Sequence, residues 1–250
     1  MTGSVYKEEI FVVTYVISDI HGQFELFMNM LKKIDLKDED TLYVLGDVID
    51  RGPHPIRTVL KLMEMPNVIC LVGNHELMAL ESLKFLMQEV TEESIKKLDQ
   101  EEMENIVTWI KYNGGQRTMD EFRTLSRDKQ EEIIEFLGDF LIYEELTVAG
   151  KDYLLVHAGL GGFYPGKDME DYSLKELIWD RAEYDIQYFP DKYVVTGHTP
   201  TQQIAGNTKP GYIYRQNNHI AIDCGCYRHG GRLAAICLDT GEEFYVSKEK

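Results

Sequence analysis

The stretch "NVICLVGNHE", residues 67–76, joins a short apolar run to three polar residues, Asn74, His75 and Glu76. A short run rich in β-branched residues is typical of a buried strand in a partly parallel sheet. Asn, His and Glu are poor residues for continuing such a strand, but their side chains can bind metal ions or transfer protons. The stretch therefore predicts a buried strand that ends at a chemically active site.

The chain before this stretch alternates between strand-like and helix-like patterns. We expect strands at residues 11–18 and 41–46, followed by helices over residues 23–34 and from Pro55 onward. The first helix has apolar residues at helical spacing, and proline is tolerated in a first helical turn. Strands that alternate with helices predict an α/β fold with a partly parallel sheet.

The rest of the chain has two further parts. Residues from about 77 to 146 are charged and poor in strand patterns, so we expect a helical insert within one domain that spans residues 1–250. The loop Asn113-Gly114-Gly115 interrupts it, either as a flexible turn or as a loop that faces substrate. Strand patterns return at 153–159, 193–199, 219–225, 232–238 and 242–247, and short glycine-rich turns predict that the last three form an antiparallel meander.

Composition restricts the possible partners. Acidic residues outnumber basic ones 43 to 26, which gives a net charge of -17 and argues against nucleic acid or an anionic membrane as the main partner. A phosphorylated ligand is still compatible, because bound metal ions supply local positive charge. No apolar run approaches the roughly 20 residues of a membrane span, and no secretory leader is apparent. We therefore expect a cytoplasmic protein with reduced cysteines.

Five predicted strands are followed by side chains that can bind metal or phosphate. In an open α/β sheet, ligands bind beyond the carboxyl ends of the strands, so these side chains should meet at one edge. One histidine after one strand would suggest packing or capping, whereas five strands that end alike indicate a common site. The side chains are Asp19 and His21; Asp47, Asp50 and Arg51; Asn74 and His75; His157; and His198.

The donor types indicate two metal ions. Aspartate, histidine and asparagine without thiolates suit Mn²⁺, Fe or Zn²⁺. One ion rarely takes six protein ligands if it must also hold a reacting water, so two ions that share a carboxylate are expected.

Five motifs resemble those of the phosphoprotein phosphatase family within the calcineurin-like metallophosphoesterases. The motifs are "SDIHGQ" (18–23), "GDVIDRG" (46–52), "GNHE" (73–76), "HAG" (157–159) and "GHT" (197–199). The resemblance implies a sandwich of two mixed β-sheets flanked by helices, with a helical insert. It also implies hydrolysis of phosphate monoesters by a hydroxide held between two metal ions, manganese first and iron or zinc as alternatives.

The resemblance assigns a role to each residue that matches a motif. Asp19 and His21 would hold the first metal, Asp47 would bridge both, and Asn74, His157 and His198 would complete the second. Arg51 and Arg181 would clamp the phosphate. His75 would give a proton to the leaving group, and Asp50 would orient His75.

The segment "IDCGCYRHGGRLAAICL", residues 222–238, is similar to two groups within the family. One is the bacterial and phage-type serine/threonine protein phosphatases, which the Asn113-Gly114-Gly115 loop favours. The other is the symmetrical diadenosine tetraphosphate hydrolases. The expected partner is a phosphorylated protein or a small phosphate ester, with a dinucleoside polyphosphate hydrolase or an inactive phosphate-binding module as alternatives.

Overall fold

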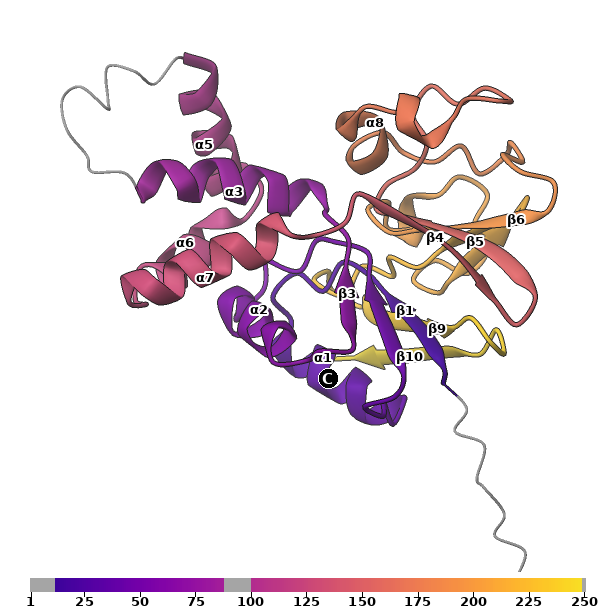
Figure 1. The fold of residues 1–250 in the computed structure, drawn as a ribbon, viewed down its shortest axis with the longest axis horizontal. Coiled ribbons are helices and arrows are strands. Elements are labelled where there is room, and N and C mark those ends of the chain that lie inside the picture. Colours follow the sequence, from indigo (N-terminus) through magenta and orange to yellow (C-terminus); the bar gives the residue numbers. More distant parts are fainter. Residues whose placement is uncertain (1–11, 88–99, 249–250) are drawn as a thin grey trace, which may run out of the picture.

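The computed structural model describes residues 12–87 and 100–248. Two five-stranded sheets pack against each other, and helices flank them (Figure 1). Both sheets contain parallel and antiparallel pairs, so the predicted α/β sandwich of two mixed sheets is confirmed. None of the described helices is long and apolar enough to cross a membrane.

The first sheet has the strand order β10-β9-β1-β2-β3. The predicted βαβ alternation accounts for its parallel half, in which β1 (Thr14–Ile17) pairs with β2 (Thr41–Val44) and β2 pairs with β3 (Val68–Cys70). The antiparallel half consists of β9 (Arg232–Cys237) and β10 (Glu243–Ser247).

The second sheet has the order β4-β5-β6-β8-β7. Strands β5 (Lys151–Val156), β6 (Lys192–Thr196) and β8 (His219–Ala221) run parallel at its centre. The antiparallel strands β4 (Tyr143–Val148) and β7 (Tyr214–Gln216) form its edges.

The period of two along a strand sends alternate side chains of β1 into different cores. Tyr15 and Ile17 belong to the core that the first sheet forms with the helices. Val16, between them, packs with Leu155 and Val195 of the second sheet. The carboxyl ends of the parallel strands are thereby held in a fixed place between two packed layers.

The helices lie in two places. Helices α1 (Phe24–Lys33) and α2 (Pro55–Met63) follow β1 and β2, and their buried residues pack into the core on the outer side of the first sheet. The insert contains four helices within the described residues, which gather beyond β3 (Figure 1). They are α3 (Asn74–Leu86), α5 (Gln100–Tyr112), α6 (Gly115–Phe122) and α7 (Arg127–Gly138).

The structure differs from the sequence prediction in several respects. The predicted meander of the last three strands is wrong, because β8 belongs to the second sheet while β9 and β10 belong to the first. The helical segment ends at Gly138, and residues 143–146 form the start of β4 instead of the end of the insert. The first strand is shorter than residues 11–18, and Phe11 and residues 88–99 of the insert lie outside the described residues.

Candidate active site

The loops after the strands of the two sheets meet at one edge of the sandwich. The backbone N–H of Asp19 donates to the carbonyl of Gly46 at 3.1 Å, and that of His21 donates to the carbonyl of Asp47 at 2.8 Å. The loop after β3 approaches just as closely, because a Cβ at Gly73 would lie 2.4 Å from Oδ1 of Asp47. Glycine is required at this position by the tight contact between the loops.

Left-handed backbone conformations concentrate at these strand ends. Ten described residues other than glycine have a positive φ, and six of them are predicted site residues. Aspartate and histidine tolerate this region better than most side chains, but each such residue still carries strain. Backbone strain of this kind clusters at functional sites. The six residues are Asp19, His21, Asp47, Asp50, Arg51 and His198.

One group of metal-ligand atoms forms around Asn74 and Asp47. Nδ1 of His198 lies 2.9 Å, and Nε2 of His157 3.2 Å, from Oδ1 of Asn74. Asp47, His157 and His198 offer donor atoms that all lie within 4.8 Å of one another, close enough to hold one ion. Nδ1 of His157 lies 2.6 Å from the carbonyl of Leu45, which fixes the ring with Nε2 toward the group.

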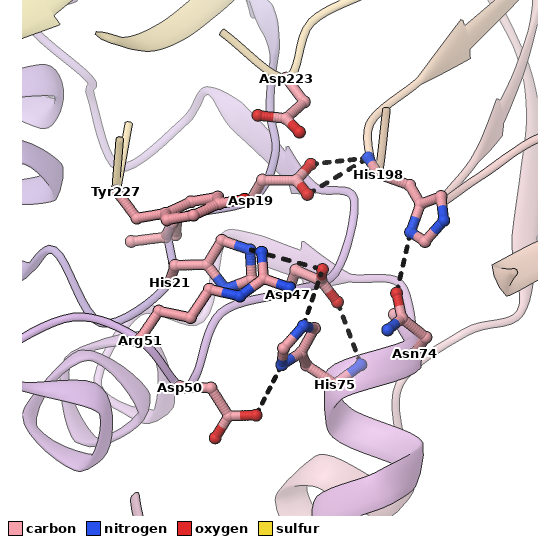
Figure 2. Close-up of polar contacts among 12 residues, drawn as sticks. Asp19, His21, Asp47, Asp50, Arg51, Asn74, His75, His198, Asp223 and Tyr227 are labelled. Atoms are coloured by element: carbon pink, nitrogen blue, oxygen red, sulfur yellow. Dashed lines mark hydrogen bonds and ion pairs between the residues drawn. The ribbon is translucent and has the colours of Figure 1, made fainter. Parts of the chain in front are cut away.

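A second group forms on the other side of Asp47. His21, Asp47 and His75 offer donor atoms within 4.8 Å of one another. Nδ1 of His21 lies 3.0 Å from the carbonyl of Ile49, so Nε2 is turned toward Asp47, 3.6 Å away. Asp19 lies beside this group, where its carboxylate accepts the backbone N–H of His198 (Figure 2). The six predicted ligands therefore converge, and the His75 ring lies beside them.

The electrostatics of the two groups fit bound cations. Burial raises the pKa of Asp19 and Asp47 well above the usual aspartate value, and neighbouring carboxylates add to the effect. Burial also lowers the pKa of His21 and His157 well below the usual value, so these rings are neutral, as metal ligands must be. Buried carboxyl groups beside neutral imidazoles are a donor set in which a bound divalent ion would stabilise the ionised carboxylates.

The Glu76 side chain binds the backbone of the loops after β2 and β3. Its fully buried carboxylate accepts the backbone N–H groups of Asp47 at 2.7 Å, Val48 at 2.8 Å and Gly73 at 3.0 Å. Burial raises the pKa of Glu76 to about 7, while these three bonds act to lower it. The residue therefore joins the loop after β2 to the start of α3, which carries Asn74 and His75.

His75 and Asp50 form a buried pair. Nδ1 of His75 lies 2.6 Å from Oδ2 of Asp50, and neither side chain is exposed (Figure 2). Nε2 of His75 is buried without a hydrogen-bond partner among the described residues. Two side chains of the insert hold Asp50 in place: Nε1 of Trp109 donates to its Oδ2 at 2.8 Å, and Oγ1 of Thr118 donates to its Oδ1 at 2.5 Å.

Three arginines border a pocket of about 120 Å³ above Asp47 and Asn74, which we call the arginine pocket. Nη1 of Arg51 lies 2.8 Å from Nε2 of His21, so Arg51 must release this nitrogen when a metal binds there. Arg181 follows α8 (Leu174–Ile178) and makes no ion pair with a described carboxylate. Arg228 is the third arginine of the pocket. Guanidinium groups in a shared pocket can bind the nonbridging oxygens of a phosphate.

Several side chains of the site were absent from the sequence prediction. Trp109 and Thr118 are two of them, because no spacing rule along the chain joins either residue to Asp50. The ring of Tyr227 packs edge-on against His21, with the Arg51 guanidinium 4.5 Å from its centre. Asp223 is buried near Asp19 (Figure 2). The segment 222–238 carries Asp223, Tyr227 and Arg228, and its resemblance to bacterial phosphatases was the available signal for them.

Residues 12–202 match the family model described as calcineurin-like phosphoesterase. "Serine/threonine-protein phosphatase 2" of Escherichia coli (strain K12) is 28% identical over 88% of this chain and 90% of that protein. "Bis(5'-nucleosyl)-tetraphosphatase PrpE [asymmetrical]" of Anoxybacillus flavithermus is 25% identical over 88% of each chain. A crystal structure of a candidate diadenosine tetraphosphatase superposes with a TM-score of 0.64 at 17% identity, over 95% of this chain and 94% of that one.

Proposed function

The chain belongs to the calcineurin-like phosphoesterase family, and from this premise we propose that it is a metal-dependent phosphomonoesterase that acts on phosphoserine and phosphothreonine in proteins. The observation that carries the proposal is the position of a buried His75–Asp50 pair beside two groups of metal-ligand atoms and an arginine pocket. Each of these parts is needed for hydrolysis of a phosphate ester, whereas binding alone would not need the His75–Asp50 pair.

The residues would divide the work as follows. Asp19 and His21 would hold one metal ion, Asn74, His157 and His198 would hold the other, and Asp47 would contact both. When bound, two such ions would neutralise charge on the phosphoryl group and make a bound water more acidic. Manganese, iron and zinc all suit these oxygen and imidazole donors.

The arginines would position the ester for this chemistry. Arg51 and Arg181 would donate N–H groups to the nonbridging oxygens and hold the phosphorus over Asp47. The leaving alkoxide of serine is a strong base, so it needs a proton as the bond to phosphorus breaks. His75 would supply that proton from Nε2 when its ring is an imidazolium, because the Asp50 carboxylate accepts the Nδ1 proton, stabilises the charged ring and fixes its orientation.

A dinucleoside polyphosphate hydrolase is the second candidate function. The relative from Anoxybacillus flavithermus, whose name gives this activity, matches as much of the chain as the phosphatase from Escherichia coli does. A cavity of about 350 Å³ also adjoins the arginine pocket, with Arg181 and Gln203 in both linings. Tyr184, Tyr214 and Ile204 line it, and aromatic and aliphatic walls of this kind can receive a nucleobase.

A substrate panel separates the candidates. The manganese-loaded protein would be given a phosphoserine peptide, p-nitrophenyl phosphate and diadenosine tetraphosphate. We expect turnover of the first two. Cleavage of the nucleotide with no activity on the phosphopeptide would instead support the second candidate. Failure to hydrolyse all three, with metal shown to be bound, would mean that the chain only binds phosphate groups.

A further inference from the structure

A second and larger pocket opens beside the arginine pocket. It has a volume of about 780 Å³, and we call it the outer pocket. Arg228 lines both pockets, so its side chain lies on the boundary between them. The outer pocket is lined by Arg228, His229, Gly230, Gly231, Arg232, Ser247 and Lys248.

The charge of the outer pocket is opposite to that of the whole chain. The chain has a net charge of -17, yet every charged side chain that lines this pocket is basic and none is a carboxylate. Within the described residues, no ion pair joins Arg228, Arg232 or Lys248 to an aspartate or glutamate, although the charge of Arg228 acts to lower the pKa of the buried Asp223. Basic side chains that gather in one pocket without ion-pair partners attract an anion.

Two of these side chains are held in place by neutral partners. Nη1 of Arg232 donates to the carbonyl of Gly211 at 3.1 Å, and its guanidinium lies 4.2 Å from the centre of the Tyr212 ring. Nε of Arg228 donates to the hydroxyl of Tyr227 at 3.0 Å. A guanidinium has five N–H donors, so these contacts fix each group and leave other donors free for a ligand.

We propose that the outer pocket binds a second phosphoryl group of the substrate, while the first lies in the arginine pocket at the metal-ligand groups. Arg228 lies between the two and contacts both phosphoryl groups. The substrate class is a phosphate ester with more than one phosphoryl group: a dinucleoside polyphosphate, or a peptide with neighbouring phosphoserines. The inference rests on the proposed hydrolysis of phosphate esters and adds a preference among them.

The first test compares substrates with one and two phosphoryl groups. The manganese-loaded protein would hydrolyse a singly phosphorylated peptide, the same peptide with an adjacent second phosphoserine, and diadenosine tetraphosphate. For the wild type we expect kcat/KM to be about tenfold higher for a substrate with additional phosphoryl groups, since each charge-assisted contact adds affinity. If the doubly phosphorylated peptide shows the higher kcat/KM, the second phosphoryl group comes from a phosphoprotein. If diadenosine tetraphosphate shows it, the second phosphoryl group comes from a nucleotide.

The matched variants are a double substitution in the outer pocket and one far from it. The preference is the ratio of kcat/KM for a substrate with additional phosphoryl groups to kcat/KM for the singly phosphorylated peptide. Arg232→Gln with Lys248→Gln should lower this ratio about tenfold, chiefly through KM. Arg127→Gln with Lys129→Gln removes the same charges from α7 and should leave the preference unchanged. Lys248→Gln alone serves as a second variant, because this exposed side chain can be changed without disturbing the fold. An equal preference in the wild type and both outer-pocket variants would overturn the proposal.

A binding measurement tests the outer pocket separately from the proposed hydrolysis of phosphate esters. Titration calorimetry would compare inorganic triphosphate with orthophosphate on the manganese-loaded wild type and on the outer-pocket variants. A loss of triphosphate affinity in the variants, with orthophosphate affinity retained, supports the outer pocket even if no ester is hydrolysed. Unchanged triphosphate affinity overturns it, while turnover of singly phosphorylated esters would leave the proposed function standing.

Discussion

Oδ2 of Asp50 receives two hydrogen-bonding partners at once, Nδ1 of His75 at 2.6 Å and Nε1 of Trp109 at 2.8 Å. Burial raises the pKa of Asp50 to about 7, and the bonds from Thr118 and Trp109 counteract that rise. These bonds therefore favour the carboxylate form, which holds the proton of His75 on Nδ1 and fixes the ring. Nε2 is then directed toward Asp47, 3.9 Å away.

Replacing His75 should remove proton donation without removing the metals. We expect His75→Asn to lose about 10²–10⁴-fold in kcat for alkyl phosphates, the usual contribution of a general acid. The loss should be smaller for p-nitrophenyl phosphate, because its leaving group needs no proton. The test is to measure kcat of the variant on both esters by steady-state kinetics, and its bound metal by elemental analysis. Full activity on the alkyl ester would rule out this role for His75.

Replacing Trp109 should weaken the same step indirectly. Trp109→Phe removes one donor from the buried Asp50 carboxylate, which costs about 1–3 kcal/mol of unfolding free energy. We also expect about tenfold lower kcat on alkyl phosphates, because an increase of about 1.4 kcal/mol in the barrier slows a reaction tenfold. Phe122→Leu, another change in a buried residue of the insert, provides the control for stability. If both variants lose activity equally on esters with good and poor leaving groups, Trp109 acts only on the fold.

The position of Arg51 should depend on Gly114. The Gly114 carbonyl accepts the Arg51 N–H at 3.2 Å, and a Cβ at Gly114 would lie 2.9 Å from Cγ of Arg51. Gly114→Ala should therefore displace Arg51 and raise KM for phosphate esters severalfold. Gly150→Ala is the matched control, because Gly150 also has a positive φ, +75°, but nothing within 4 Å. Both variants should lose about 1 kcal/mol of stability from backbone strain, and a KM that rises equally in both would contradict the prediction.

The sequence predicted the parts of the site that lie at strand ends. The period-two strands and the polar residues after them follow local rules, so Asp19, Asp47 and Asn74 could be placed at one edge before the structure was known. Trp109 and Thr118 could not, because they reach Asp50 through the packing of α5 and α6. Strand β7 was also missed, although Asn217 and Asn218, both at positive φ, form the kind of two-residue turn that joins hairpin strands.

The error in the meander has a physical cause. A short glycine-rich turn normally joins neighbouring strands of one sheet, and this rule was applied to the segment between β8 and β9. Here that segment crosses from the second sheet to the first and carries Tyr227 and Arg228 into the arginine pocket. The exception to the local rule therefore coincides with a segment of the candidate site, as expected where a site imposes its own requirements.

Replacing Glu76 should weaken metal binding without removing a ligand. Glu76→Gln exchanges one carboxylate oxygen for an amide group that cannot accept a hydrogen bond, so at least one of the Asp47, Val48 or Gly73 N–H groups loses its partner. We expect about 10–100-fold weaker Mn²⁺ affinity, the usual effect of changing a group that orients metal ligands. Calorimetric titration with Mn²⁺ measures this. Glu144→Gln on β4 is the control, and equal affinities in the two variants would refute the assigned role of Glu76.

Manganese should stabilise the protein more strongly as pH rises. In the metal-free fold the pKa values of Asp19 and Asp47 are raised well above usual, so protons remain on these groups that metal binding must displace. The pKa values of His21 and His157 are lowered, so these rings are already neutral and add little pH dependence. Each displaced proton strengthens binding by about 1.4 kcal/mol per pH unit, up to the raised pKa.

The measurement is the rise in melting temperature on adding Mn²⁺, at pH about 5.5 and about 7.5. At a free Mn²⁺ concentration of 100 times Kd, stabilisation should be about 2.7 kcal/mol, and it should shrink at the lower pH as Kd rises. Asp47→Asn should abolish most of the effect, because it removes a carboxylate that both groups of ligand atoms share. The rise in melting temperature could instead stay constant or become smaller as the pH increases. That result would show that Asp19 and Asp47 are already ionised without metal, and that the metal ions bind without displacing protons from them.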